Sequence, residues 1–169
     1  MESRSIPSFT GIVLNPCCLI HMYASGQMEE ILLSWKTPVF ITAFTYEYEN
    51  LQREPMDLEP LVQQGAIHVA TLSSSELMDA TNAYSPVLGV DSEAYALALA
   101  HHRNWAIGVD MPVTCSFFRR LVPDIPLLST FDLLYHWAES RSLSSDVVQE
   151  VLQLMHQRVG YKSFSIPHF

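Results

Sequence analysis

Five short apolar runs, separated by longer segments with helical spacing, constrain the fold of this chain more than any other feature. Two of the runs stop directly at Asn15 and Asp110, and the segments between the runs place apolar side chains three or four residues apart. Short buried strands that alternate with helices are typical of a parallel sheet, because parallel strands need a crossover between them. The sequence therefore predicts an α/β fold. The predicted strands cover residues 12–14, 38–41, 67–70, 105–109 and 125–128.

Capping and turn signals locate the predicted helices. Ser73 and Glu76 have the spacing of a capping box, Pro112 suits the first turn of a helix, and Ser129 or Thr130 can cap the helix that follows. No repeat, low-complexity tract or linker interrupts the pattern, so we predict a single domain over residues 1–169. Helices are expected at 17–23, at 28–35 after a cap at Ser25, from 42 to about 51, and at 73–84, 92–103, 112–122, 130–140 and 144–159, with a turn at 85–89.

The charge balance excludes some classes of function. The 169 residues include 18 acids and 9 bases, which gives a net charge of -9. A broad surface for duplex DNA needs clustered lysine and arginine, which this chain lacks. Three cysteines, two of them adjacent, do not form a disulfide framework. The apolar stretch 11–22 is interrupted by Asn15-Pro16 and is too short to span a bilayer. We therefore expect a cytoplasmic protein with no membrane partner.

Polar side chains stand where several predicted strands end and helices begin. Asn15 ends the first strand, and Asp110 directly follows a later one. Glu47 lies in the first turns after the second strand, and Glu93 opens a helix. These positions lie at one edge of a parallel sheet, so the side chains can meet in one cleft. Grouped carboxylates favour Mg²⁺ or Mn²⁺, which activate water and stabilise a phosphodiester under attack.

Simpler explanations exist for each of these acids. An acid at a helix start complements the helix dipole, which accounts for Glu93 by itself. An acid on a turn after a strand, such as Asp110, is also ordinary. Glu49 competes with Glu47 for the cleft, because the two are about 200° apart around a helix and only one can face it.

The seven histidines contain no pair at helical i, i+4 spacing. Adjacent His101 and His102 are expected to point to different faces, so the sequence does not favour zinc. His21 is interpreted as a packing histidine near the cleft. The pair Arg119-Arg120 is interpreted as a solvated helix face, with contact to RNA phosphate as the alternative.

Several motifs resemble those of PIN-domain proteins. Residues 13–20 (VLNPCCLI) and 23–26 (YASG) resemble the opening of that family. Residues 88–94 (LGVDSEA) resemble its glycine-glutamate-alanine helix start, and residues 105–110 resemble the strand that carries the next acid. Residues 126–130 (PLLST) resemble the last strand and its helix, so the likeness extends from about Ile12 to Tyr161. The resemblance implies a three-layer α/β/α fold and a metal-dependent ribonuclease site of about four acids.

Site residues are carried over from the resemblance one by one. Glu47, Glu93 and Asp110 match acidic positions and would hold or orient a Mg or Mn ion. Thr130, or Ser129, matches a hydroxyl position near that ion. Many members of the family are toxins of toxin–antitoxin pairs, and the family often forms homodimers. The resemblance thus implies RNA as substrate and a small antitoxin protein as partner.

The chain departs from the family pattern at the site itself. Asn15 stands where the pattern has its first aspartate, Met111 where a second aspartate often follows the one matched by Asp110, Thr114 where an arginine is usual, and Ser92 where a glycine precedes Glu93. An asparagine oxygen can bind a cation but brings no charge. We expect Asn15 to weaken the metal affinity, whether this residue is natural or an engineered inactivating change.

Two functions follow from these observations. The retained acids favour a PIN-like metal-dependent endoribonuclease with weakened activity. Asn15 and Met111 favour a catalytically inactive protein-binding module of the same fold.

Overall fold

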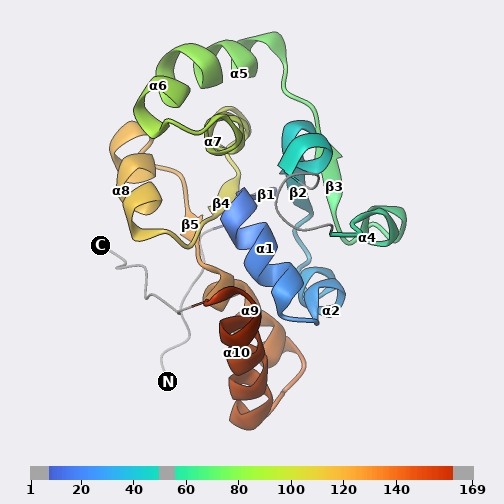
Figure 1. The fold of residues 1–169 in the computed structure, drawn as a ribbon. Helices are drawn as coiled ribbons and strands as arrows, with labels where there is room; N and C mark the ends of the chain where they lie inside the picture. Colours follow the sequence, from blue (N-terminus) through green and yellow to red (C-terminus); the bar gives the residue numbers. More distant parts are fainter. Residues whose placement is uncertain (1–7, 50–55, 162–169) are drawn as a thin grey trace.

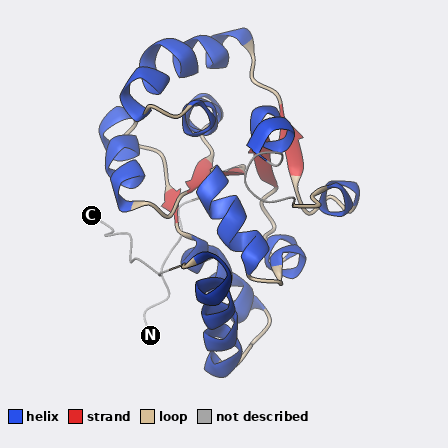
Figure 2. Ribbon diagram, in the orientation of Figure 1, coloured by secondary structure: helices blue, strands red, loops and turns tan. Residues whose placement is uncertain are grey.

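A five-stranded sheet with all strands parallel runs through the centre of the molecule (Figures 1 and 2). The structure is a computed structural model and describes residues 8–49 and 56–161. The predicted α/β fold is confirmed, and each predicted strand is present: the first has the predicted bounds, the second is shifted by one residue, and the other three are shorter than predicted. The strands are β1 (Ile12–Leu14), β2 (Val39–Thr42), β3 (His68–Ala70), β4 (Ala106–Gly108) and β5 (Leu127–Leu128), in the order β3-β2-β1-β4-β5.

Helices cover both faces of the sheet, which gives three layers (Figure 1). Successive strand residues point to opposite faces, so Ile12 and Leu14 pack in one core and Val13 in the other. The first core is enclosed by α1 (Pro16–Ala24), α2 (Met28–Leu33), α4 (Glu59–Gln63), α9 (Thr130–Ser140) and α10 (Ser145–Val159). The second is enclosed by the π-helical turn η2 (Ala80–Tyr84), α7 (Asp91–Arg103) and α8 (Pro112–Leu121). Helix α5 (Ser74–Asp79) packs against η2 and α7.

Helix α7 packs tightly against the second face because its inner side chains are small. Ala94, Ala96, Ala98 and Ala100 are all fully buried, together with Leu97 and Leu99. Short side chains let the helix axis approach the strands closely, and α7 contacts β1, β2 and β4. Its first turn lies at the carboxyl edge of the sheet and its last turn at the amino edge, directly before β4. The two ends of this helix therefore lie on opposite sides of the sheet.

The structure corrects some local predictions. Residues expected to form a turn at 85–89 form the short helix α6 (Ser85–Leu88), which ends at Gly89 in the left-handed conformation. The helix expected at 73–84 becomes π-helical in its second half, and the one expected from residue 42 is the π-helical turn η1 (Thr45–Glu49).

The predicted cap at Ser25 is also wrong. The N-cap of α2 is Gln27, and Ser25 instead ends α1, where its backbone amide donates to carbonyl oxygens of that helix. The Ser25 hydroxyl donates to the carbonyl oxygen of Met22 and accepts from the Gln27 amide. The serine therefore joins the two helices across the bend rather than starting the second one.

The predicted capping box at Ser73 is present. Of the two residues predicted to cap α9, Ser129 is the N-cap, and it forms a capping box with Asp132. Across residues 8–49 and 56–161, no helix is long and apolar enough to cross a membrane.

Candidate functional site at the carboxyl edge of β1 and β4

The candidate site lies where the strand order of the sheet reverses. β1 and β4 are neighbours, but the chain leaves β1 towards β2 and leaves β4 towards β5. In such sheets the crevice outside the carboxyl ends of these two strands is where ligands bind. Asn15 directly follows β1, and its backbone amide donates to the carbonyl oxygen of Gly108 at the end of β4. Asp110 comes two residues after Gly108, so Asn15 and Asp110 both lie at the carboxyl ends of these two strands.

Asp110 is buried and holds three hydrogen bonds. Its Oδ1 accepts from the backbone amide of Thr130 at 2.7 Å, and its Oδ2 accepts from the Thr130 hydroxyl at 2.5 Å. Nδ1 of His21 is also 2.5 Å from Oδ2. Thr130 is the first residue of α9, so the carboxylate lies at a helix N-terminus, where the helix dipole favours negative charge. These contacts occupy both oxygens of the Asp110 side chain.

His21, on α1, supplies the positive charge beside Asp110. Burial of the ring opposes its charged form, but hydrogen bonds to Asp110 and Cys17 outweigh that effect and raise the pKa of His21 to about 9. The ring is therefore an imidazolium at neutral pH. The edge of Tyr161 packs against it, with the ring centroids 4.7 Å apart. His21 is thus more than the packing histidine that the sequence suggested.

Asn15 acts as the N-cap of α1. Its Oδ1 accepts from the backbone amide of Cys18 at 2.9 Å, and the side chain is fully buried. Within the described part of the chain, Nδ2 of Asn15 has no hydrogen-bond partner. The oxygen that the sequence offered as a weak metal ligand is therefore committed to the helix, and the group that remains unpaired is a donor.

Glu93 lies on the same rim as Asp110. It is in the first turn of α7, and the hydroxyl of Thr114 on α8 is 3.3 Å from Oε1 and 3.4 Å from Oε2. Burial raises the pKa of the Cys115 thiol to about 11. Arg119 opposes this increase, whereas the charges of both Asp110 and Glu93 add to it. The charges of the two acids therefore act on the same thiol.

The other predicted site residues occupy different roles. Glu47 lies in η1 beyond β2 with an exposed side chain, and no described hydrogen bond joins it to Asp110. The side chain of its competitor, Glu49, lies outside what the structure describes. Of the two hydroxyl candidates, Thr130 contacts Asp110. Ser129 caps α9, with its hydroxyl and amide bonded to Asp132.

The donor set, as placed, does not fit a hard divalent cation. Such an ion takes carboxylate oxygens that are free to coordinate it. Both oxygens of Asp110 already accept hydrogen bonds, the oxygen of Asn15 is used in a helix cap, and the imidazolium of His21 would repel a cation. Glu93, another predicted ligand, accepts from the hydroxyl of Thr114 at 3.3 and 3.4 Å.

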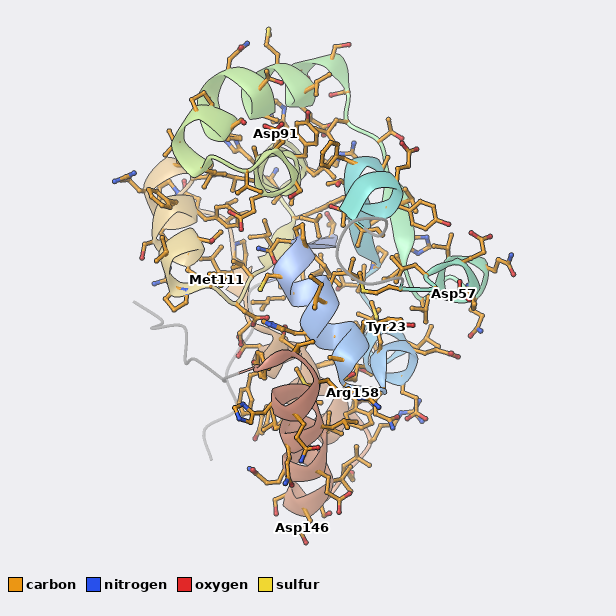
Figure 3. The ribbon with its side chains drawn as sticks, viewed as in Figure 1. Tyr23, Asp57, Asp91, Met111, Asp146 and Arg158 are labelled. Atoms are coloured by element: carbon orange, nitrogen blue, oxygen red, sulfur yellow. The ribbon has the colours of Figure 1, made fainter. Side chains whose placement is uncertain are left out.

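The rim of the site is apolar rather than basic. Three exposed apolar side chains are close in sequence to the site residues Glu93, Asp110 and Thr114. They are Val90, Met111 and Val113, which are 43%, 48% and 63% exposed. Met111 lies at the start of α8, on the flank that also carries α6 (Figure 3).

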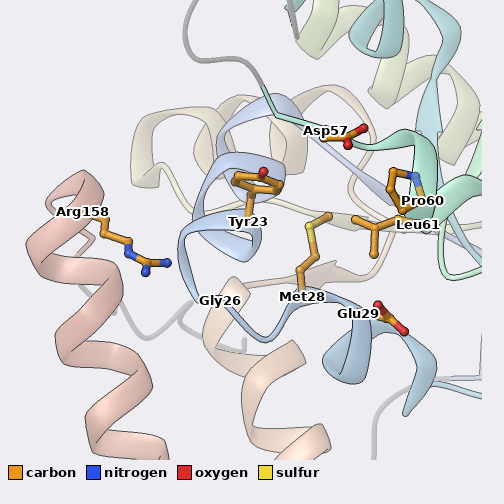
Figure 4. A pocket seen from close by; sticks show the side chains of 8 residues that line it. All are labelled: Tyr23, Gly26, Met28, Glu29, Asp57, Pro60, Leu61 and Arg158. Carbon is orange, nitrogen blue, oxygen red and sulfur yellow. The ribbon is translucent and has the colours of Figure 1, made fainter.

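An open cavity of about 360 Å³ lies away from this site (Figure 4). Tyr23 and Gly26 line it at the C-terminal end of α1, whereas Asn15 caps the N-terminal end of that helix. Met28 and Leu61 form part of its wall, and Arg158 approaches from α10. This cavity is therefore separate from the predicted site acids, none of which lines it.

A second polar group was not expected from the sequence. His101 and His102, at the last turn of α7, lie beside Asp79 at the end of α5, and ligand atoms of the three residues are within 4.8 Å of one another. The expectation that the two histidines point to different faces is wrong, because their rings are 5.5 Å apart and reach the same neighbour. The packing of α5 against α7 brings Asp79 close to the two histidines, and the local spacing of the sequence does not predict that packing.

Comparison of the sequence with protein-family models and with curated proteins gave no match.

Proposed function

We propose that this chain is a PIN-like protein-binding module whose carboxyl-edge site does not hydrolyse RNA. The contact between His21 and Asp110 carries this proposal. An imidazolium 2.5 Å from the carboxylate balances its charge from within the protein, at the position where a nuclease of this family would need a metal ion. The neutral Asn15, with its oxygen bound to the Cys18 amide, supports the same conclusion.

The surface around the site favours a protein partner over RNA. RNA and DNA backbones are held by lysine and arginine, but the residues that border this site are Val90, Met111 and Val113, and the chain has a net charge of -9. Exposed apolar side chains around a polar centre are a feature of protein interfaces. The proposed partner, in the cytoplasm, is a protein that offers an apolar segment to this rim.

The second candidate is a weak Mg²⁺- or Mn²⁺-dependent endoribonuclease of the toxin type, with a small antitoxin partner. One observation favours it: Asp110 follows β4 at the switch point of the sheet, and its charge and that of Glu93 act on the same thiol, Cys115. This activity would require His21 to leave Asp110.

Mn²⁺ titration by calorimetry, combined with an RNA cleavage assay, separates the two candidates. The wild-type chain should bind no Mn²⁺ at the cleft and cleave no RNA. Asn15→Asp combined with His21→Ala should gain Mn²⁺ affinity, because it restores a carboxylate and removes the internal cation. Each titration is repeated with Asp79→Ala, so that binding at the Asp79 group is not counted.

RNA cleavage by the wild-type chain that requires Mn²⁺ and disappears in Glu93→Gln would overturn the proposal in favour of the endoribonuclease. The binding role has its own readout. Any partner retained by the wild-type chain should be lost with Val113→Asp and kept with Val69→Asp, a matched exposed valine on β3.

A further inference from the structure

Two histidines and an aspartate form a compact exposed group at the C-terminal end of α7. One ligand atom each from Asp79, His101 and His102 lies within 4.8 Å of the others, and α5 and α7 both contribute. In Figure 1, α7 is seen nearly end-on below α5 and α6. We propose that this group binds a divalent transition metal of the Zn²⁺ type and that the metal ties α5 to α7.

The donor set matches such a metal in chemistry and in size. Imidazole nitrogen suits zinc, cobalt, nickel and copper, whereas Mg²⁺ prefers oxygen ligands alone. Zinc lies about 2.0–2.2 Å from nitrogen and oxygen ligands, so tetrahedral ligands are about 3.3 Å from one another. Nε2 of His102 is 2.7 Å from Oδ2 of Asp79. Small side-chain rotations would admit the ion, which replaces the proton between these two atoms and leaves one position open to water.

A neighbouring tyrosine orients the group. The hydroxyl of Tyr84, in η2, is 2.5 Å from Nδ1 of His101 and so restricts rotation of that ring. Hydrogen bonds of this kind to metal-bound histidines fix the ligand geometry and contribute to affinity.

The electrostatic surroundings also favour a cation. The histidines occupy the last turn of a 13-residue helix, whose C-terminal carbonyl groups carry partial negative charge. Arg103, the next residue, does not oppose the ion, because it is paired with Glu76 through bonds of 2.7 and 2.9 Å and donates to the carbonyl oxygen of Thr71. The site is at the opposite end of α7 from Glu93, so it is independent of the function proposed above.

Zinc titration of the untagged full chain tests the proposal. The parent chain for this titration carries Cys17→Ser, because Cys17 Sγ and His21 Nε2 are 3.8 Å apart and form a nitrogen–sulfur pair that would compete for Zn²⁺. We expect one equivalent of Zn²⁺ by calorimetry, a visible Co²⁺ spectrum typical of tetrahedral coordination, and a melting temperature that rises with Zn²⁺ and not with Mg²⁺. His102→Ala and Asp79→Ala should abolish these effects, and Tyr84→Phe should weaken binding about tenfold.

His68→Ala is the matched control, because His68 is an exposed histidine on β3 outside the group, and it should bind Zn²⁺ as the parent does. Melting curves without metal establish that each variant folds. Two results overturn the proposal: no saturable Zn²⁺ binding by the parent, or equal Zn²⁺ affinity in the parent, His102→Ala and Asp79→Ala.

Discussion

Two histidine–aspartate pairs of this protein lie in opposite surroundings. At the carboxyl edge of β1 and β4, His21 and Asp110 are 2.5 Å apart and their side chains are 15% and 5% exposed. At the last turn of α7, His102 and Asp79 are 2.7 Å apart, but their side chains are 28% and 44% exposed. Similar distances therefore accompany very different degrees of burial.

Burial decides what a histidine–aspartate pair can do. A buried carboxylate must be balanced and hydrogen-bonded within the protein, and Thr130 and His21 together meet that need for Asp110. An exposed pair is screened by water and contributes little to folding, so its atoms remain available to a ligand. The comparison teaches that the buried pair stabilises the fold, whereas the exposed pair is free to bind.

The largest predicted effect is the difference in stability between removing the carboxylate of the buried pair and removing that of the exposed pair. Asp110→Ala leaves His21 and the amide of Thr130 without their buried acceptor and should lower the free energy of unfolding by about 3–5 kcal/mol. Asp79→Ala, without metal, should cost less than about 1 kcal/mol, since that pair is solvated. Urea denaturation at pH 7 with a chelator present measures both. Equal losses of unfolding free energy in the two variants would contradict the distinction between the buried pair and the exposed pair.

The pH dependence of stability gives the next effect. The pKa of His21 is raised from 6.5 to about 9 in the folded protein, so its stabilising contribution is complete below pH 6.5 and is lost as the pH rises through 9. We expect a loss of about 2 kcal/mol between pH 6.5 and 8.5. Burial raises the pKa of Cys18 and of Cys115, which would add losses near and above pH 9, so the measurement stops at 8.5.

His21→Gln is the control for this prediction. Glutamine does not titrate, so the difference in unfolding free energy between wild type and His21→Gln should shrink as the pH rises. A difference that stays constant from pH 6.5 to 8.5 would mean that the ring is not charged in the folded protein.

The smallest effect compares the two capping boxes. Ser129→Ala removes a buried cap beside Asp110, and Ser73→Ala removes an exposed cap on α5. Loss of a serine cap costs about 0.5–2 kcal/mol, and we expect Ser129→Ala in the upper half of that range and Ser73→Ala in the lower half. Thermal denaturation of the two variants gives the order. The reverse order would show that burial does not strengthen the cap.

Local signals predicted most of the fold. Short apolar runs predict all five strands, and the capping box at Ser73 is predictable because its bonds join residues only three apart. Residues 85–88 are helical although a turn is predicted there, because proline is tolerated in the first turn of a helix.

The candidate site was predictable only in part. Strand ends predict Asp110, since the carboxyl edge of a parallel sheet follows from the order of its elements. Thr130, with Ser129 as the alternative, is predicted only by the resemblance to the PIN-domain family. The contact of His21 with Asp110 joins residues 89 positions apart, and its distance depends on how α1 lies over the sheet. The meeting of Asp79 with His102 likewise depends on the packing of α5 against α7. Sequence spacing carries no signal for either contact.

The N-cap at Asn15 has a consequence for how such a protein can change over generations. Asparagine and aspartate cap helices about equally well, so α1 places little constraint on which of the two stands there. Their codons differ by a single base. The start of α1 therefore does not depend on the charge at residue 15. One nucleotide change can add or remove a carboxylate at the end of β1 while the first helix still begins at the same residue.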